Sequence, residues 1–458
     1  MFCSSFAQPH LLAYRISVCV IAAVLAPATL CAQVKLQAHA AERFLDSMGV
    51  NVHMEYTTTP YGNYGLINER LRELGMHHIR DEINNTADPF VDELNTIGTL
   101  GYKLCGLIEG GNDYPPVGET LDASKVVPMI EGLLPTIDAV EGPNEPDDSS
   151  TPPFQYGIDR LLYPGGAINE SEALWSIVKH NSYLRYLPVL AMSEGTPQDF
   201  AQLAAITPPP IDYATYGNLH AYQNGFFADW GLNDLYIPTA RLLTGGKLLW
   251  TTEMGYHNNT HFLTDGEQQG VSERASAIYL PIAFLSGFNK GIPRTFSYEL
   301  IDEAADFSDP SGEGHYGLLD FYGNPKPAFT ALQNLIRILR EPNGEHFDPG
   351  SLTITFENAP ATVDYTLLQK SNGDYYLAIW NDAMVYQIAN SKKAAHDIYS
   401  PRVPVTMKFS TSHNFTVYAP NDPSGVNPTD IYTIATTDQS IRVDLPAKVL
   451  LIKITRDR

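Results

Sequence analysis

Two glutamates stand where apolar segments of the sequence give way to polar residues. Glu145 follows the apolar residues 137–141 and lies between Pro143 and Pro146, which remove two backbone donors and so predict a stiff loop. Glu253 lies near the end of an apolar run, where an unpaired carboxylate would be costly to bury. Two carboxyl groups that face one pocket can cleave a glycosidic bond, one as proton donor and the other as nucleophile.

The segments that must position these glutamates form a regular series. Short apolar segments alternate with segments of helical periodicity between about residues 45 and 340, a pattern typical of alternating strands and helices. The predicted strands are residues 49–56, 77–83, 103–108, 137–141, 187–192, 213–222, 248–254 and 294–300. Helices are predicted at residues 66–74, 170–180, 198–205, 273–286 and 327–340. This order predicts an α/β fold, a (β/α)8 TIM barrel, whose active site lies at the carboxyl ends of the strands.

The last quarter of the chain has a different pattern. Short alternating β segments are separated there by Asn, Asp, Gly and Pro, which predicts an antiparallel β-sandwich. These segments are residues 352–356, 363–369, 375–380, 403–409, 414–418, 431–436, 440–444 and 449–454. We therefore expect a catalytic barrel at residues 33–342 and a β-sandwich domain at residues 345–458, divided at Asn343 and Gly344.

Residues 1–32 have the features of a secretory signal peptide. Arg15 precedes an almost unbroken apolar run at residues 16–30, and Ala32 is a small residue at a plausible cleavage point. The run is shorter than a membrane span requires, so we expect a secreted or periplasmic protein without integral membrane association; an uncleaved anchor is the alternative. The mature chain would keep Cys105 as its single cysteine and so have no internal disulfide.

The overall charge narrows the class of partner. The 458 residues carry 52 acidic and 29 basic side chains, a formal net charge of −23. Such a charge repels phosphate backbones, so we expect no nucleic acid partner. An oligosaccharide or polysaccharide substrate fits better, while the oligomeric state stays open.

The order of the polar motifs resembles the clan A glycoside hydrolases, the "4/7" retaining barrels. Asn144-Glu145-Pro146 follows the fourth predicted strand, and Glu253 ends the seventh. The resemblance implies that Glu145 is the general acid/base, that Glu253 is the nucleophile and that Asn144 binds the sugar 2-hydroxyl. The barrel followed by a β-sandwich most resembles the β-xylosidase and α-L-iduronidase group within this clan.

Three further residues follow from the same resemblance, and two others depart from it. Arg80, which ends the second strand, would hydrogen-bond the nucleophile, and His220 and Tyr222 resemble the sixth-strand His-x-Tyr motif. Many clan members carry Trp at the end of the eighth strand, where this chain has Tyr298 and Glu299. We expect both to contact substrate, although Glu299 could instead form a salt bridge.

Several alternatives remain open. Arg80 could be a structural partner of Asp81 or Glu82, and the protein could be a carbohydrate-binding barrel that has lost its chemistry or a transglycosylase. We expect no cofactor and no metal site. The histidines His257 and His261 are four residues apart but lack a helical context, and the acidic residues 302–313 lack the ordered spacing of a calcium loop.

Overall fold

The computed structural model describes residues 32–83, 89–108, 121–147, 155–156, 161–206, 210–261, 268–307, 312–341, 346–389, 393–421 and 438–456. Residues 1–31 of the predicted signal peptide, the predicted boundary at residues 343–344 and the predicted strand at residues 431–436 lie outside this part of the chain. Within it, no helix is both long and apolar enough to cross a membrane.

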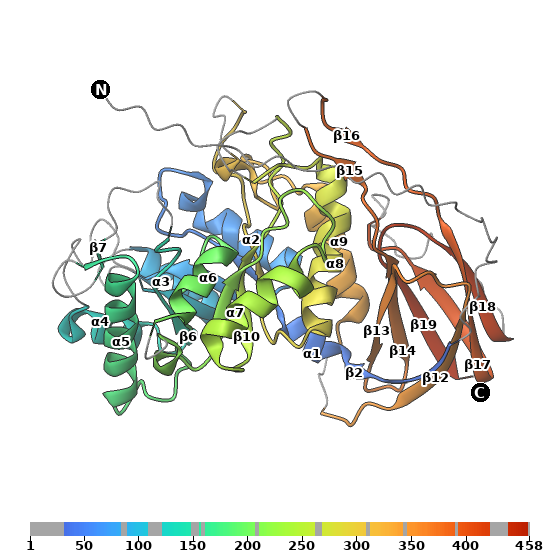
Figure 1. The fold of residues 1–458 in the computed structure, drawn as a ribbon, viewed down its shortest axis with the longest axis horizontal. Coiled ribbons are helices and arrows are strands. Elements are labelled where there is room, and N and C mark those ends of the chain that lie inside the picture. Colours follow the sequence, from blue (N-terminus) through green and yellow to red (C-terminus); the bar gives the residue numbers. More distant parts are fainter. Residues whose placement is uncertain are drawn as a thin grey trace, which may run out of the picture.

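Parallel strands form a closed barrel (Figure 1). Seven of them pair in the order β6 (Ile137–Glu141), β5 (Lys103–Leu107), β4 (His78–Glu82), β3 (Met48–Asn51), β11 (Thr295–Ser297), β10 (Leu249–Met254) and β9 (Gly217–His220). Between β6 and β9, Val189 pairs with Val140 and Leu190 pairs with Tyr216 through isolated parallel bridges. These two residues occupy the fifth strand position and close the ring. The predicted (β/α)8 barrel is confirmed.

Helices surround the barrel and end where the sequence provides caps. Their bounds are α1 (Ala41–Asp46), α2 (Tyr64–Leu74), α3 (Pro89–Thr99), α4 (Ala123–Gly132), α5 (Gly165–His180), α6 (Pro197–Ala204), α7 (Ile237–Thr244), α8 (Glu273–Asn289) and α9 (Pro327–Leu339). The Asn63 side chain accepts the Leu66 N–H at the start of α2, and Gly75 ends that helix in the left-handed conformation. These caps place the end of α2 directly before β4.

An antiparallel β domain packs beside the barrel. Its sheet runs β1 (Ala32–Gln37), β12 (Ser351–Glu357), β17 (Val403–Tyr418), β19 (Leu450–Arg456), β14 (Tyr375–Asn381), β13 (Val363–Gln369) and β2 (His39–Ala40), and β18 (Asp438–Leu445) also pairs with β17. Short strand pairs β7 (Gln155–Tyr156) with β8 (Leu161–Leu162), and β15 (Tyr386–Gln387) with β16 (His396–Asp397), lie outside it. Strand β17 covers two predicted strands, because its pairing with β18 shifts register between Lys408 and His413 without a turn. The sandwich surrounds a second apolar core that includes Leu377, Met407 and Phe415.

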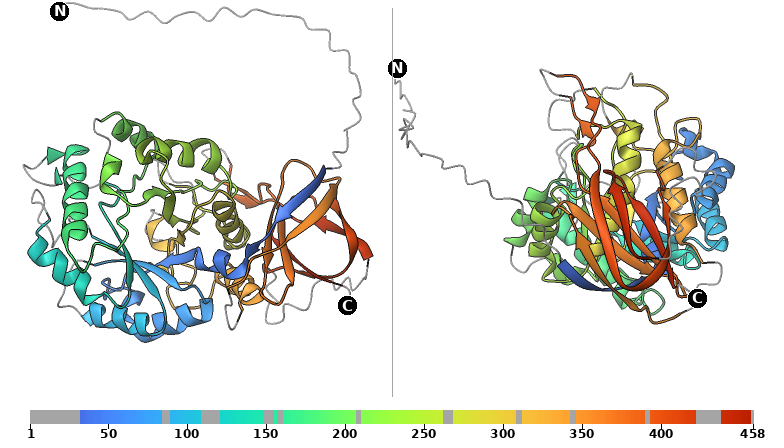
Figure 2. Two further views of the ribbon diagram at one scale, coloured as in Figure 1. Left: turned by 90° about the horizontal axis from the view of Figure 1, so that it is seen from below. Right: turned by 90° about the vertical axis from the view of Figure 1, so that its right-hand side faces the viewer.

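The N-terminal strand belongs to this β domain. Residues Ala32 to Gln37 pair along their whole length with β12, and Figure 2 shows the dark blue strand among the orange ones. The observed arrangement therefore differs from the predicted barrel start at residue 33. Residues 33, 35 and 37 are exposed and Val34 and Leu36 are half-buried, the alternation of a strand with one covered face.

Helix α8 joins the two domains. Its residues from Ala275 to Gly287 are all buried, because the helix packs between the barrel and the β domain (Figure 1). A helix covered on every side can be apolar all round, which explains why its sequence has little amphipathic character. The Tyr279 hydroxyl on this helix accepts the Val385 N–H of the β domain at 2.9 Å. The barrel core thus extends into the β domain, where it includes Leu368, Tyr376 and Trp380, and it is separate from the core inside the sandwich.

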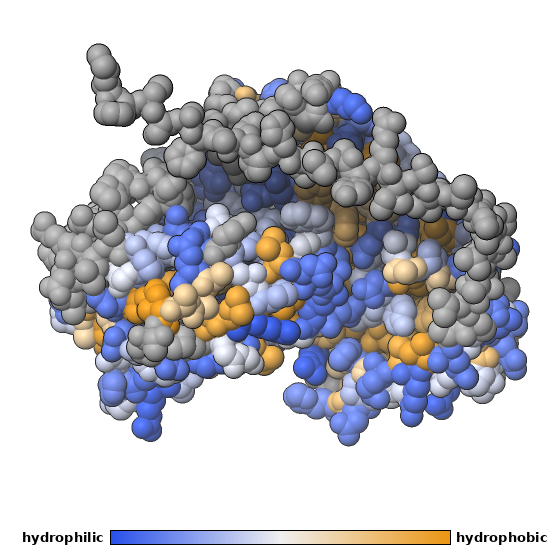
Figure 3. All heavy atoms as spheres, in the orientation of Figure 1, coloured by the Kyte–Doolittle hydropathy of each residue, from blue (hydrophilic) through white to orange (hydrophobic). Residues whose placement is uncertain are grey.

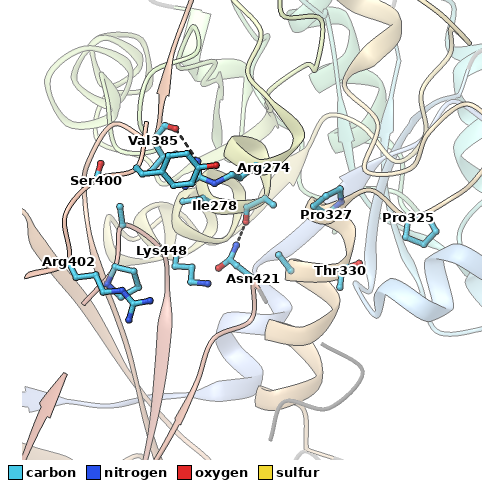
Figure 4. A pocket seen from close by; sticks show the side chains of 15 residues that line it. Arg274, Ile278, Pro325, Pro327, Thr330, Val385, Ser400, Arg402, Asn421 and Lys448 are labelled. Atoms are coloured by element: carbon cyan, nitrogen blue, oxygen red, sulfur yellow. Dashed lines mark hydrogen bonds between the residues drawn. The ribbon is translucent and has the colours of Figure 1, made fainter. Parts of the chain in front are cut away.

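A cavity of about 650 Å³ lies at this junction (Figure 4). Its lining includes Arg274 and Ile278 from α8, Thr330 from α9, and Tyr399 and Lys448 from the β domain. The candidate catalytic residues do not line it. The face of the molecule in Figure 3 is largely hydrophilic where it is coloured, with small apolar patches, in keeping with the high acidic content.

Candidate active site

Glu145 lies in the loop after β6 and is partly open to solvent, with 27% of its side chain exposed. Its φ is +38°, in the left-handed region that a residue other than glycine seldom adopts. The Ser193 hydroxyl accepts the Glu145 N–H at 3.2 Å and helps to hold this conformation. Strained backbone of this kind concentrates at functional sites, and here it presents the carboxylate at the carboxyl end of the barrel strands.

Glu253 lies on β10 and is nearly enclosed, with 9% of its side chain exposed. The Arg80 guanidinium donates to its Oε1 at 2.7 Å, and the Tyr222 hydroxyl donates to its Oε2 at 2.7 Å. Burial opposes ionisation, but the charges of His220 and Arg80 and the Tyr222 hydrogen bond outweigh it, so the pKa of Glu253 lies below its ordinary value. This carboxylate is held in the form that a nucleophile needs.

Arg80 lies at the centre of the site. It projects from β4, is buried, and donates hydrogen bonds to Glu253 (2.7 Å), Glu141 (2.8 and 3.0 Å), Asn51 (3.0 Å) and Asn144 (2.7 Å). Its carboxylate partners are therefore Glu141 and Glu253. The structural pairing with Asp81 or Glu82, which the sequence left open, is not the one formed.

Glu141 was not predicted as a site residue. It is the last residue of β6, it is fully buried, and it grips Arg80 with both oxygens. Its Oε1 also accepts hydrogen bonds from Asn218 at 2.8 Å and from Thr252 at 2.9 Å. A glutamate inside an apolar strand was the signal that could have revealed it, because such a charge must be paired to be buried. Glu141 fixes Arg80, and Arg80 in turn positions Glu253.

His220 connects the two candidate catalytic carboxylates. Its Nδ1 is 2.6 Å from Glu145 Oε1 and 3.5 Å from Glu253 Oε2, while its Nε2 is 3.0 Å from Thr252 Oγ1. Burial lowers the pKa of His220, but the charges of Glu253 and Glu145 outweigh it and leave the pKa raised. The two acidic side chains beside the ring therefore favour its protonated form.

The separation of the two glutamates bears directly on their chemistry. One oxygen of Glu145, one of Glu253 and a ring nitrogen of His220 all lie within 4.8 Å of one another. Retaining glycosidases hold their carboxyl groups about 5–5.5 Å apart, whereas inverting enzymes separate them by about 6.5–9.5 Å to admit a water molecule. The same three groups could geometrically hold a cation, although Arg80 already pairs with Glu253.

The remaining predicted site residues lie around this pair. Asn144 is half-buried, and its Oδ1 faces Arg80, so its amide nitrogen points the other way. Tyr298 is also half-buried, and its hydroxyl donates to Glu313 Oε1 at 2.8 Å. Glu299 is fully buried and accepts a hydrogen bond from Tyr61 at 2.7 Å. Asn144 and Tyr298 are thus partly accessible, whereas Glu299 is enclosed. Contact between Glu299 and substrate stays a prediction, and the burial of Glu299 disfavours it.

Two more residues of this pocket were not predicted as site residues. Glu313 begins a short 3-10 helix, is exposed to solvent and accepts the Tyr298 hydroxyl at 2.8 Å. Tyr316 packs edge-on against both Tyr222 and Tyr298, with ring centroids 5.6 and 5.5 Å away. Both residues follow the eighth strand in a segment without regular periodicity, so their position could not be predicted from the sequence.

Solved structures share this fold across nearly the whole chain. A family 39 glycoside hydrolase from the gut symbiont Bacteroides cellulosilyticus WH2 aligns with a TM-score of 0.60 at 13% identity, over 92% of this chain and 82% of the other. The GH39 enzyme from Xanthomonas axonopodis pv. citri aligns with a TM-score of 0.56 at 14% identity, over 92% and 96%. A monomeric β-xylosidase from Caulobacter crescentus CB15 gives 0.52 at 14%, over 93% and 98%.

Sequence comparison adds no nearer relative. No family model and no curated protein matches the chain. At 13–14% identity the structural likeness shows the fold alone. The protein has the barrel and β-domain fold of the family 39 glycoside hydrolases and of this β-xylosidase, which is the resemblance that the order of its motifs predicted.

Replacement of Tyr222 by Phe tests how Glu253 is kept ionised. The change removes a hydrogen bond to a charged group, worth about 1.5–3 kcal/mol, so we expect kcat/KM to fall about 10- to 100-fold. Because that bond lowers the pKa of Glu253, its loss raises the pKa, and the acidic limb of the kcat/KM profile moves to higher pH. Tyr256→Phe is the control, since its hydroxyl donates to the Phe226 carbonyl. An unmoved acidic limb in Tyr222→Phe would exclude this role.

Proposed function

We propose that this protein is a retaining glycoside hydrolase that cleaves O-glycosidic bonds of an oligosaccharide or polysaccharide. The observation that carries the proposal is the pair Glu145 and Glu253, whose oxygens approach within 4.8 Å and whose surroundings differ. Glu253 is enclosed and held by Arg80 and Tyr222, whereas Glu145 is partly open to solvent. Two carboxyl groups with opposite protonation needs are suited to double displacement.

The reaction proceeds in two balanced steps. The Glu253 carboxylate attacks the anomeric carbon while Glu145 gives its proton to the departing oxygen, which breaks the glycosidic bond and forms a glycosyl ester. Glu145, now ionised, takes a proton from water, whose oxygen attacks the same carbon and releases Glu253. Asn144, oriented by Arg80, offers its amide nitrogen to the sugar 2-hydroxyl. His220 remains beside both carboxylates throughout.

The test uses the purified chain on a panel of aryl glycosides and polysaccharides, with Glu145→Gln and Glu253→Gln as inactive references. Nuclear magnetic resonance of the first-formed sugar gives its anomeric configuration. Retention by the wild type alone supports the proposal, and inversion would overturn the two-step mechanism. Oligosaccharide binding without cleavage across the panel would instead favour the lapsed, carbohydrate-binding alternative. Products formed on sugar acceptors rather than on water would favour a transglycosylase.

Glu145→Ala separates the acid step from the nucleophilic step. General acid catalysis contributes about 10²–10⁴-fold, so we expect that loss on a glycoside with a poor leaving group. A dinitrophenyl glycoside needs no proton on its leaving group, and it should still show a burst of dinitrophenol followed by slow turnover. Added azide should restore turnover by replacing the activated water. The control is Glu131→Ala, which replaces an exposed glutamate on α4 that is not among the candidate site residues. Equal losses on both substrates would remove Glu145 from the acid role.

Export to the periplasm or the medium is part of the proposal and rests on residues 1–32. N-terminal sequencing of the protein recovered from each cell fraction tests it directly.

A further inference from the structure

A second cluster of ionisable side chains lies beside the catalytic pair. His53 follows β3 and Glu299 follows β11, and Glu303 lies four residues after Glu299. Strands β3 and β11 are neighbours in the barrel, which brings these distant parts of the sequence together. One ligand atom from each of the three residues lies within 4.8 Å of the other two. His53 is also within electrostatic reach of Glu253 and Arg80.

Several polar atoms of this cluster are buried and have no hydrogen-bond partner in the part of the chain that the structure describes. Both ring nitrogens of His53, Oε1 of Glu299 and Oε1 of Glu303 make no hydrogen bond. His53 is only 7% exposed, and its Nε2 lies 3.7 Å from Glu299 Oε2. A buried polar atom without a partner costs about 1–3 kcal/mol, and several in one place indicate that a partner binds among them.

The charges around the cluster favour a cation. The carboxylates of Glu313 and Glu82 also act electrostatically on Glu299 and Glu303 respectively. The nearby cations are already paired, Arg80 with Glu141 and Glu253 and Lys326 with Asp302. A neutral imidazole offers a nitrogen lone pair to a metal ion, and the His53 ring nitrogens lie beside the Glu299 and Glu303 carboxylates.

We propose that His53, Glu299 and Glu303 bind one divalent metal ion, Zn²⁺ or Mn²⁺. One imidazole nitrogen and two carboxylate oxygens are a donor set for these ions, whereas Ca²⁺ and Mg²⁺ prefer oxygen alone. Three protein ligands leave positions open for water or a sugar hydroxyl. The Tyr61 hydroxyl, which donates to Glu299 Oε2 at 2.7 Å, orients that carboxylate from outside.

This site is absent from the sequence expectations for a physical reason. Its ligands come from two strands at opposite ends of the barrel sequence, so no short spacing marks them. The acidic residues 302–313, which lack the order of a calcium loop, supply one ligand to a site that is completed elsewhere. The proposal does not depend on the proposed glycosidase activity.

The experiment measures bound metal directly. The purified full chain is stripped with a chelator and equilibrated separately with Zn²⁺, Mn²⁺, Mg²⁺ and Ca²⁺, and the bound ion is counted by native mass spectrometry and titration calorimetry. We expect one Zn²⁺ or Mn²⁺ per chain. Loss of a residue that only hydrogen-bonds a metal ligand weakens metal binding about 10- to 100-fold. Because His53 and Glu303 would bind the metal directly, His53→Ala and Glu303→Gln should each weaken binding by more than about 100-fold.

Controls separate this site from other sites and from misfolding. His180→Ala replaces an exposed histidine on α5 and should bind as the wild type does. Circular dichroism melting checks each variant, and the nearly isosteric Glu303→Gln keeps the test valid if His53→Ala does not fold. Stoichiometric binding that survives Glu303→Gln but is lost in Glu145→Gln would place the ion between the catalytic carboxylates and overturn the proposal. The absence of stoichiometric binding by the wild type would also overturn it.

Discussion

Glu253→Ala is expected to abolish hydrolysis and leave the protein folded. Removal of a catalytic nucleophile lowers kcat by about 10⁴-fold or more, because no other group can form the covalent intermediate. The fold should survive because Arg80 keeps Glu141, Asn51 and Asn144 as partners when Glu253 is removed. Turnover of an activated aryl glycoside and a thermal melt measure the two effects.

Azide distinguishes a lost nucleophile from a damaged site. In Glu253→Ala, azide can enter the vacated space and attack the anomeric carbon, which gives a glycosyl azide of inverted configuration. In Glu145→Ala, azide attacks the glycosyl ester on Glu253 and gives the retained configuration. Identical configurations from the two variants would contradict the assigned roles. Substantial turnover by Glu253→Ala without added azide would remove Glu253 from the role of nucleophile.

Arg80→Met, unlike Glu253→Ala, is expected to lower the stability of the fold as well as the activity. It leaves Glu141 and Glu253 buried without their shared cation, and breaking a buried ion pair on one side costs about 3–5 kcal/mol. We therefore expect a large fall in the free energy of unfolding, together with loss of activity. Denaturant unfolding, followed by fluorescence and circular dichroism, measures the change.

Two further variants test the reason for that loss. Arg80→Met combined with Glu141→Gln removes one of the two uncompensated charges and should recover part of the stability. Lys408→Met breaks an ion pair with Glu357 in which 53% of the lysine side chain is exposed, and such pairs contribute less than about 1 kcal/mol. If Arg80→Met were no more destabilising than Lys408→Met, the central role of Arg80 in the site would be wrong.

The barrel could be predicted because its strands are short apolar runs that each end in polar residues. The same pattern placed Glu145 and Glu253 at the carboxyl ends of the fourth and seventh strands, and the structure brings them together. The resemblance predicted a hydrogen bond from Arg80 to Glu253, which the structure contains, but the second carboxylate partner, Glu141, could not be predicted from nearby residues. Successive side chains of a strand face opposite sides, so Arg80 on β4 reaches across the barrel to Glu141 and Glu253 instead of to its neighbour Asp81.

Loop positions and distant pairings were beyond the sequence. His53 and Glu303 meet only because the barrel closes between β3 and β11, and no local spacing encodes that closure. The alternation in residues 33–37 is enough to predict a strand. It does not identify the partner, since any edge of the β domain would satisfy the same pattern.

The pairing of β1 with β12 also sets the order in which the molecule can be completed. Ala32 pairs with Phe356, so the first of the described strands must wait for one that is synthesised after the whole barrel. The barrel is therefore inserted in sequence between two parts of the β domain, and the pairing of β1 with β12 joins those two parts. A fragment that begins at residue 345 would lack β1 and expose the edge of β12, the kind of edge along which separate molecules join their sheets.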